Sequence, residues 1–147
     1  MASDYDLEDE ESLPNFRHLL HMPEIIAAVG RWIAIDMPSS FDVGGLVVGD
    51  APNTANLWMK SPGILAGLPF AEAAFAACGE GCSVAWEDVA VEGSFIDPAS
   101  MSADGRVLVA TVAGPSNALL RGERVALNIL SRCSGVATAS FRCVQAS

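Results

Sequence analysis

The sequence predicts an α+β fold, with a mainly antiparallel sheet flanked by helices and a long helix at its C-terminal end. Three observations lead to this prediction. The apolar pattern runs in the order helix, loop, strands, helix, strands, helix, and only one short helix separates the strands. The 147 residues suffice for one domain with a sizeable core. Apolar residues in the segment 121–142 recur at steps of three or four, which is helical spacing.

The N-terminal third is predicted to contain a tail, one helix and a loop. Residues 1–22 are interpreted as an acidic, disordered tail, because its first eleven residues hold six acids and no base. A helix is predicted to begin at Pro23, whose fixed φ and missing N–H suit the first helical position. Its apolar stripe comprises Ile25, Ile26, Val29, Trp32 and Ile33. Residues 36–56 are rich in Pro, Ser, Gly and Asn, and are predicted to form a loop around a short apolar run at 46–48.

Strands and a short helix are predicted for the middle of the chain. The segment 57–60 is predicted as a strand, 61–63 as a turn and 64–66 as a second extended piece. A helix is predicted over 69–77, with Pro at its start and Gly just after its end. Alternation of apolar and polar residues over 84–91 predicts a further strand.

The last third carries the clearest strand and the longest helix. The segment 106–112 follows an Asp-Gly turn and is rich in Val, which predicts a strand. Residues 114–117 break this strand and begin the final helix, which is predicted to run to the end of the chain. Gly135 lies inside that helix at a cost of about 1 kcal/mol relative to Ala. We therefore expect close packing or a break at Gly135.

The composition excludes several classes of protein. A net charge of −10 argues against a nucleic-acid surface, which needs a basic stripe. No apolar run approaches the ~18 residues of a membrane span, so no membrane association is expected. No secretory signal follows Met1, and the four cysteines show no zinc spacing. We therefore expect free structural thiols, no metal-binding residues, and a cytoplasmic location, with the nucleus as an additional one.

The chain is also unusually apolar for its size. Apolar residues make up 51% of the sequence before its 13 glycines are counted, whereas about 45–50% with Gly included is usual. Because no membrane span accounts for this excess, it predicts a large interface with another domain or subunit. A very apolar interior is the alternative.

Positive charge is concentrated on the last predicted helix. The segment 121–142 holds four of the eight basic residues and one acid, Glu123, although the rest of the chain is strongly acidic. Arg124 lies off the apolar row of this helix. We therefore expect the helix to bury one face and to present the Arg124 guanidinium to an anion on another. The apolar row comprises Ala126, Leu130, Cys133, Ala137, Phe141 and Val144.

Three segments carry a resemblance to a known family. They are WMKSPGILAGLPF at 58–70, VAGPSNALL at 112–120 and GERVALNILSRCSGVAT at 122–138. Their wording and separation resemble the N-terminal domain of quinolinate phosphoribosyltransferase, the decarboxylating enzyme of de novo NAD synthesis, in its eukaryotic form. The resemblance assigns residues 23–147 to that domain.

The resemblance implies a fold and a reaction. The family combines an N-terminal open-faced α/β sandwich with a C-terminal α/β barrel, and two subunits pair head to tail, so a homodimer or higher homo-oligomer is implied. Quinolinate and phosphoribosyl pyrophosphate, with Mg²⁺, give nicotinate mononucleotide, pyrophosphate and CO₂. The arginine of the GERVALN motif, here Arg124, is implied to reach a quinolinate carboxylate across the subunit interface. Asn128, one turn further on, is a candidate for supporting Arg124 by a hydrogen bond.

The chain also departs from the family pattern. It stops at Ser147, before any TRKTTPG-like segment or barrel, so we expect a fragment that is inactive alone and that binds no cofactor. No residue of this chain is assigned a catalytic or metal-binding role. Two readings remain open: one half of a phosphoribosyltransferase, or an inactive interaction module that docks on the full enzyme's barrel. A phosphoribosyltransferase acting on nicotinate fits the motifs less closely.

Other candidate residues receive structural interpretations. Arg121 and Arg132 are predicted to form surface or interface ion pairs. The rings of Trp58 and Trp86 are predicted to belong to the core. Gly122 is expected to allow another backbone or a ligand to approach the helix.

Overall fold

The computed structural model describes residues 16–37, 42–79 and 81–146. Within these ranges the helical elements are η1 (Phe16–Leu19), α1 (Met22–Asp36), α2 (Val43–Val48), α3 (Leu68–Ala76), α4 (Pro98–Met101) and α5 (Ser116–Gln145). The strands are β1 (Pro52–Met59), β2 (Gly63–Ile64), β3 (Ser83–Trp86), β4 (Phe95–Ile96) and β5 (Val107–Pro115). No helix in this described part is long and apolar enough to cross a membrane.

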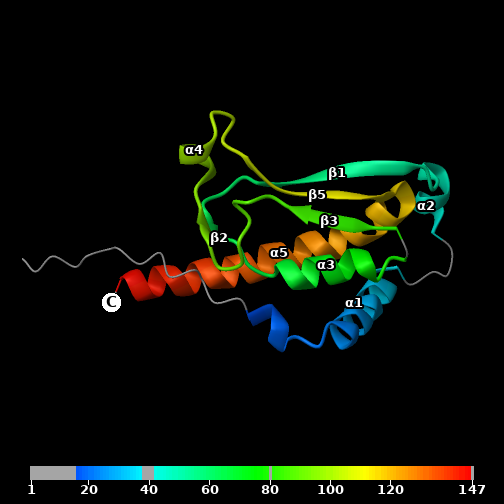
Figure 1. The fold of residues 1–147 in the computed structure, drawn as a ribbon, viewed down its shortest axis with the longest axis horizontal. Helices are drawn as coiled ribbons and strands as arrows, with labels where there is room; N and C mark the ends of the chain where they lie inside the picture. Colours follow the sequence, from blue (N-terminus) through cyan, green and yellow to red (C-terminus); the bar gives the residue numbers. More distant parts are fainter. Residues whose placement is uncertain (1–15, 38–41, 80, 147) are drawn as a thin grey trace, which may run out of the picture.

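A three-stranded antiparallel sheet forms one layer of the fold. β5 lies at its centre, with β1 and β3 on either side. β1 pairs with the whole of β5, from Pro52 opposite Pro115 to Met59 opposite Val107, with a register shift between Leu57 and Trp58. Figure 1 shows α5 and α3 packed below the sheet and α1 below them. The predicted class is confirmed: a mixed α/β fold with an antiparallel sheet and a long C-terminal helix.

The core lies between the sheet and the helices. Its buried side chains come from α1, α3, β5 and the first half of α5, and they include Val29, Ile33, Ala73, Phe75, Val112, Ala126 and Leu130. Burial of these apolar surfaces is the main contribution to stability, at roughly 25 cal/mol per Å². Of the predicted row on α5, Ala126 and Leu130 are buried, whereas Phe141 is 39% and Val144 74% exposed. The apolar row of α5 is therefore buried only in the first half of the helix, where α3 and the sheet cover it.

Two predicted boundaries in the N-terminal third differ from the structure. The predicted loop over 36–56 was wrong, because α2 and the first half of β1 lie within it. The polar start of β1 is an exposed edge strand, and its pairing with β5 rather than its own side chains makes it extended. Within the predicted tail, 1–22, residues 1–15 lie outside the described part. Phe16–Leu19 form η1, beside an ion pair from Arg17 to Glu72 of α3.

Neither glycine of α5 has the structural role that the sequence predicted for it. Helix α5 is continuous through Gly135, and a Cβ added there would meet no atom within 4 Å, so neither a break nor close packing exists at that position. At Gly122 a Cβ would lie 2.7 Å from Cδ1 of Phe75 and 3.2 Å from Sγ of Cys78. Gly122 is therefore needed for close packing of α5 on α3, and the space beside it is filled by the chain's own core.

Candidate functional site

The start of α5 is fixed to the sheet. Pro115 ends β5, and the hydroxyl of Ser116 donates to the carbonyl of Ala51 at 2.9 Å. The backbone N–H of Asn117 donates to the carbonyl of Gly49 at 3.0 Å. The second of these bonds satisfies an N–H group that the first turn of a helix leaves without a partner. They also fix the rotation of α5 about its axis, and so the direction in which its arginines project.

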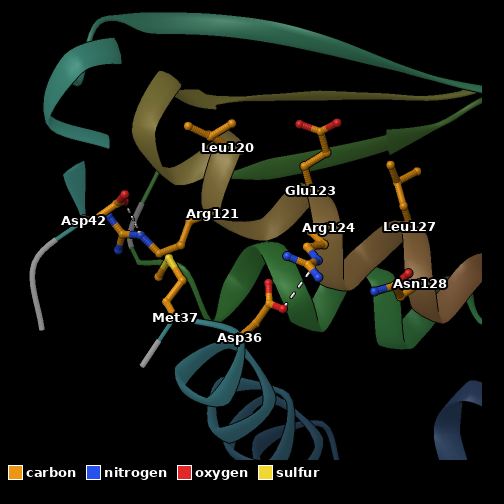
Figure 2. Close-up of a pocket in the computed structure, with 9 residues that line it drawn as sticks. All are labelled: Asp36, Met37, Asp42, Leu120, Arg121, Glu123, Arg124, Leu127 and Asn128. Atoms are coloured by element: carbon orange, nitrogen blue, oxygen red, sulfur yellow. Dashed lines mark ion pairs between the residues drawn. The ribbon is translucent and has the colours of Figure 1, made fainter. Parts of the chain in front are cut away.

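A cavity of about 420 Å³ lies beside the first half of α5. Its wall is formed by side chains of α5, the end of α1 and the residue preceding α2 (Figure 2). The polar and charged residues of this wall are Asp36, Asp42, Arg121, Glu123, Arg124 and Asn128. Its volume falls in the range of about 300–1,000 Å³ that is usual for small-molecule sites.

Arg124 is the most exposed arginine of this wall. Its side chain is 73% exposed, and its Nε lies 3.4 Å from Oδ1 of Asp36, at the end of α1. The prediction that Arg124 points away from the core agrees with this position. Exposed ion pairs contribute about 0–1 kcal/mol, so Asp36 restrains this guanidinium only weakly.

Arg121 is held more firmly. Its Nη1 donates to the carbonyl of Cys78 at 3.3 Å, and its Nε lies 3.6 Å from Oδ2 of Asp42. Asp42 also caps α2, because its Oδ1 accepts a hydrogen bond from Gly45 N at 2.8 Å. The predicted ion pair of Arg121 is thus present, but the side chain is only 30% exposed and faces the cavity rather than open solvent.

Asn128 lies one turn beyond Arg124 and lines the same cavity. The described partner of Arg124 is Asp36, so support of Arg124 by Asn128 stays a prediction. The sequence did not predict that Asp36 and Asp42 belong to this site. Each of them lies more than 75 residues along the chain from the arginine that it contacts. No local pattern signals such pairs.

Cys78 lies beside the site. Its thiol is buried and donates to the Ala74 carbonyl at 3.2 Å. Burial raises the pKa of this thiol to about 11, although the nearby Arg121 guanidinium lowers it. None of the four cysteines, all of which the structure describes, forms a disulfide. Cys78 is therefore a protonated core residue at neutral pH.

A second cavity, of about 540 Å³, lies between the end of β1 and the second half of α5. Lys60, Arg142 and Trp58 line it. The core prediction for Trp58 was wrong, because this residue is 40% exposed and the guanidinium carbon of Arg106 lies 4.5 Å from its ring centroid. Trp86 is half-buried and donates from Nε1 to Glu72 at 2.7 Å.

Among the residues described, no group of three or more His, Cys, Asp or Glu is arranged to hold a metal ion.

The fold and this site together define an open-faced α/β sandwich domain, with two arginines of its long C-terminal helix beside one cavity. Residues 41–134 match the family described as quinolinate phosphoribosyl transferase, N-terminal domain. That match covers more than half of the chain, and the chain belongs to this family.

Known proteins support the assignment. The chain is 44% identical over 130 residues to the human nicotinate-nucleotide pyrophosphorylase [carboxylating], covering 88% of the chain and 40% of that protein. It is 43% identical over 127 residues to the rat protein of the same name, covering 86% and 38%. The crystal structure of NadC from Streptococcus pyogenes shares the fold, with a TM-score of 0.74 at 24% identity, over 86% of this chain and 43% of that one. The chain thus spans about two fifths of the length of these relatives.

Proposed function

We propose that this chain provides the quinolinate-binding arginine and part of the subunit interface of a nicotinate-nucleotide pyrophosphorylase. The complete assembly would act in the cytoplasm and convert quinolinate and phosphoribosyl pyrophosphate to nicotinate mononucleotide, pyrophosphate and CO₂. The proposal is supported by family membership and by the names of the relatives. Its main structural support is that Arg124 presents an exposed guanidinium from α5, where the ion pair described for it is the one with Asp36, at 3.4 Å.

The role proposed for Arg124 follows from the charges of the substrates. Quinolinate carries two carboxylates and phosphoribosyl pyrophosphate several phosphates, so a pocket that binds both gathers much negative charge. A planar guanidinium suits a carboxylate better than an ammonium does, because it donates two parallel hydrogen bonds. In the proposed reaction the ring nitrogen attacks the ribose carbon as pyrophosphate leaves. Arg124 would orient the ring for this attack by holding one carboxylate.

Decarboxylation follows in the same proposal. The pyridinium stabilises the electron pair left on the ring carbon as the carboxylate beside the nitrogen departs as CO₂, and a proton from solvent then takes its place on that carbon. The described residues do not offer a cluster of acids for the Mg²⁺ that accompanies phosphoribosyl pyrophosphate. We propose that residues for the metal and the phosphates belong to other parts of the assembly.

Steady-state kinetics of a full-length protein that carries this domain test the role of Arg124. Arg124→Ala is expected to lower kcat/KM for quinolinate by about 10²–10³, as loss of a preorganised donor to a developing charge does. Arg132→Ala is the matched control, because Arg132 is an exposed arginine on the same helix outside the cavity. Equal kinetics for Arg124→Ala and the unaltered enzyme would exclude Arg124 from the site.

The 147-residue chain alone provides a second test. We expect no nicotinate mononucleotide from quinolinate, phosphoribosyl pyrophosphate and Mg²⁺, because the chain spans only about two fifths of the length of the relatives that carry the enzyme's name. Turnover by the chain alone would refute this part of the proposal.

A second function, as an interaction module, is favoured by the exposed apolar side chains. They lie on α1, α2 and the second half of α5, and include Trp32, Ile35, Leu46, Val47, Val136 and Val144. Scattered apolar residues are ordinary on a protein surface, whereas contiguous ones mark interfaces. Adding the chain to an intact enzyme of the family separates the two functions. A module that displaces an intact subunit lowers the enzyme's activity and forms a mixed oligomer on size-exclusion chromatography.

A further inference from the structure

The second cavity, of about 540 Å³, is lined by the end of β1, the turn that follows it and the second half of α5. Figure 1 shows β2, which follows this turn, above the second half of α5. Oγ1 of Thr138 joins the two segments, because it accepts a hydrogen bond from Ile64 N at 2.8 Å. Leu127 is the one described residue that lines both this cavity and the first. The charged residues of the two cavities are therefore different.

The charge of the second cavity is opposite to the charge of the chain. The sequence holds 18 acids and 8 basic residues, yet Lys60 and Arg142 line the cavity and no described acid does. Arg106 adds positive charge beside it, since its guanidinium carbon lies 4.5 Å from the ring centroid of Trp58, which is part of the wall. Like charges that line one cleft attract ions of the opposite sign. An anion is therefore attracted to this place on an acidic protein.

Lys60 and Arg142 are available to a ligand. Both residues are exposed. The ion pairs of the described part involve other basic residues, namely Arg17, Arg121 and Arg124. No described carboxylate therefore neutralises Lys60 or Arg142, and a ligand at these residues displaces water instead of an acid of the chain.

Much of the remaining wall is apolar. Its apolar side chains come from β1, the segment after it, β5 and α5, and they include Leu57, Met59, Leu65, Val109 and Leu130. A ligand pocket typically has such a wall together with a few polar groups that orient the ligand. The cavity volume lies within the usual range of about 300–1,000 Å³ for such pockets.

Gly135 contributes to the open space of the cavity. It lies within α5 at a cost of about 1 kcal/mol relative to Ala. A Cβ at this position would meet no atom within 4 Å, so packing inside the chain does not require a glycine. Gly135 lines the second cavity, and a larger side chain there would occupy space that a ligand needs.

We propose that the second cavity binds a small amphipathic carboxylate, whose head is bound by Lys60 and Arg142 and whose apolar chain lies against the apolar wall. A guanidinium donates two parallel hydrogen bonds to a carboxylate, and an ammonium adds a second positive charge. The apolar chain gains about 0.8 kcal/mol for each CH₂ group that it buries. This inference goes beyond the proposed function, because neither Arg124 nor Arg121 takes part in it.

Calorimetric titration of the 147-residue chain with octanoate and with 1-octanol tests the role of the two basic residues. The probes share an apolar chain and differ in the charge of the head. Octanoate is expected to bind about tenfold more tightly, because its head makes a charge-assisted contact. Lys60→Ala/Arg142→Ala is expected to bind both probes equally. Arg31→Ala/Arg132→Ala removes the same charge from exposed residues outside the cavity, and is expected to keep the preference.

Gly135→Leu tests the position of the ligand. Leucine favours the helix and its side chain enters open space, so the fold is expected to remain, as circular dichroism can verify. The affinity for octanoate is expected to fall at least tenfold, because the new side chain fills the cavity. Arg124→Ala is the control: under the proposed function it weakens binding of quinolinate (pyridine-2,3-dicarboxylate), and it is expected to leave the affinity for octanoate unchanged.

Several results would overturn the inference. They are failure of the unaltered chain to bind octanoate, equal affinity for the two probes, and a preference for octanoate that survives Lys60→Ala/Arg142→Ala. If Gly135→Leu does not fold, amide chemical shifts of the unaltered chain decide the position. Octanoate is expected to change those of residues 57–63 and 131–142, and changes centred on the exposed apolar residues of α1 or α2 overturn the inference. None of these results bears on Arg124, whose role the kinetics of the full-length protein still test.

Discussion

Nε of Arg124 lies 3.4 Å from Oδ1 of Asp36, so a carboxylate of the chain's own first helix contacts the guanidinium proposed to bind quinolinate. The Asp36 side chain is 29% exposed, and the pair joins the C-terminal end of α1 to the first half of α5. A ligand carboxylate at Arg124 has to compete with Asp36 or share the guanidinium with it.

The first prediction follows from this competition. Asp36→Asn keeps the shape of the side chain and removes its charge, and is expected to raise the affinity for pyridine-2,3-dicarboxylate roughly two- to fivefold. An exposed ion pair contributes at most about 1 kcal/mol, and this energy sets the upper limit of the expected gain in affinity. Thermal unfolding is expected to change little. Asp104→Asn, which changes an exposed acid outside the cavity, is the control. An affinity that falls in Asp36→Asn would show that Asp36 positions Arg124 for the ligand instead of competing with it.

The second prediction concerns the two glycines within α5. Gly122→Ala is expected to destabilise the fold by about 1–3 kcal/mol, because the new Cβ would lie 2.7 Å from the ring of Phe75 and overpack the contact with α3. Gly135→Ala is expected to stabilise the fold by about 0.5–1 kcal/mol, since it adds a helix-favouring residue in open space. Urea unfolding of both variants measures the difference. Equal effects of the two substitutions would contradict the packing described for Gly122.

The order of the longer elements could be predicted from the sequence, because it depends on local patterns, whereas the short α2, β4 and α4 were not predicted. Pro23, the turn before β5 and the break at Pro115 each determine the backbone within a few residues. The position of Arg124 outside the core followed from helical spacing alone. The first half of β1 could not be predicted in this way, because its residues are polar and become extended only by pairing with β5.

The candidate site was predicted only in part. The spacing on α5 and the resemblance indicated Arg124, but the cavity depends on contacts between segments far apart in the sequence. Asp36 and Asp42 reach the arginines only after α1 and α2 have packed against α5. The burial of Arg121 Nε likewise results from tertiary packing. Neither composition nor periodicity contains such information.

The third prediction concerns Glu92, which caps the N-terminus of α3. Its carboxylate accepts hydrogen bonds from the backbone N–H groups of Gly67, at 2.8 Å, and Leu68, at 2.9 Å. These are first-turn donors without partners in the helix, at its positive end. Glu92→Ala is expected to cost about 1–2 kcal/mol of the free energy of unfolding. Glu87→Ala, at an exposed acid before the same loop, is expected to cost less than 0.5 kcal/mol, roughly the usual surface value. Denaturant midpoints of the two variants provide the comparison, and equal midpoints would exclude the capping role.

The fourth prediction is a loss of stability at alkaline pH that depends on Cys78. Burial raises the pKa of this thiol from 9.0 to about 11, so the folded protein binds the proton more tightly than the unfolded chain does. The resulting stability is fully present below pH 9 and is lost as the pH rises to about 11, with an upper limit of about 2–3 kcal/mol. Cys78→Ala removes the titrating group without adding volume. The difference in the free energy of unfolding between the unaltered protein and Cys78→Ala is therefore expected to shrink over this pH range. A difference that stays constant from pH 8 to pH 11 would contradict the assigned burial of the thiol.

Alkylation at pH 8, followed by mass spectrometry, provides an independent measurement of this burial. The exposed Cys143 is expected to react before Cys78. The protonated, buried sulfur of Cys78 becomes accessible to the reagent only when α3 and α5 separate.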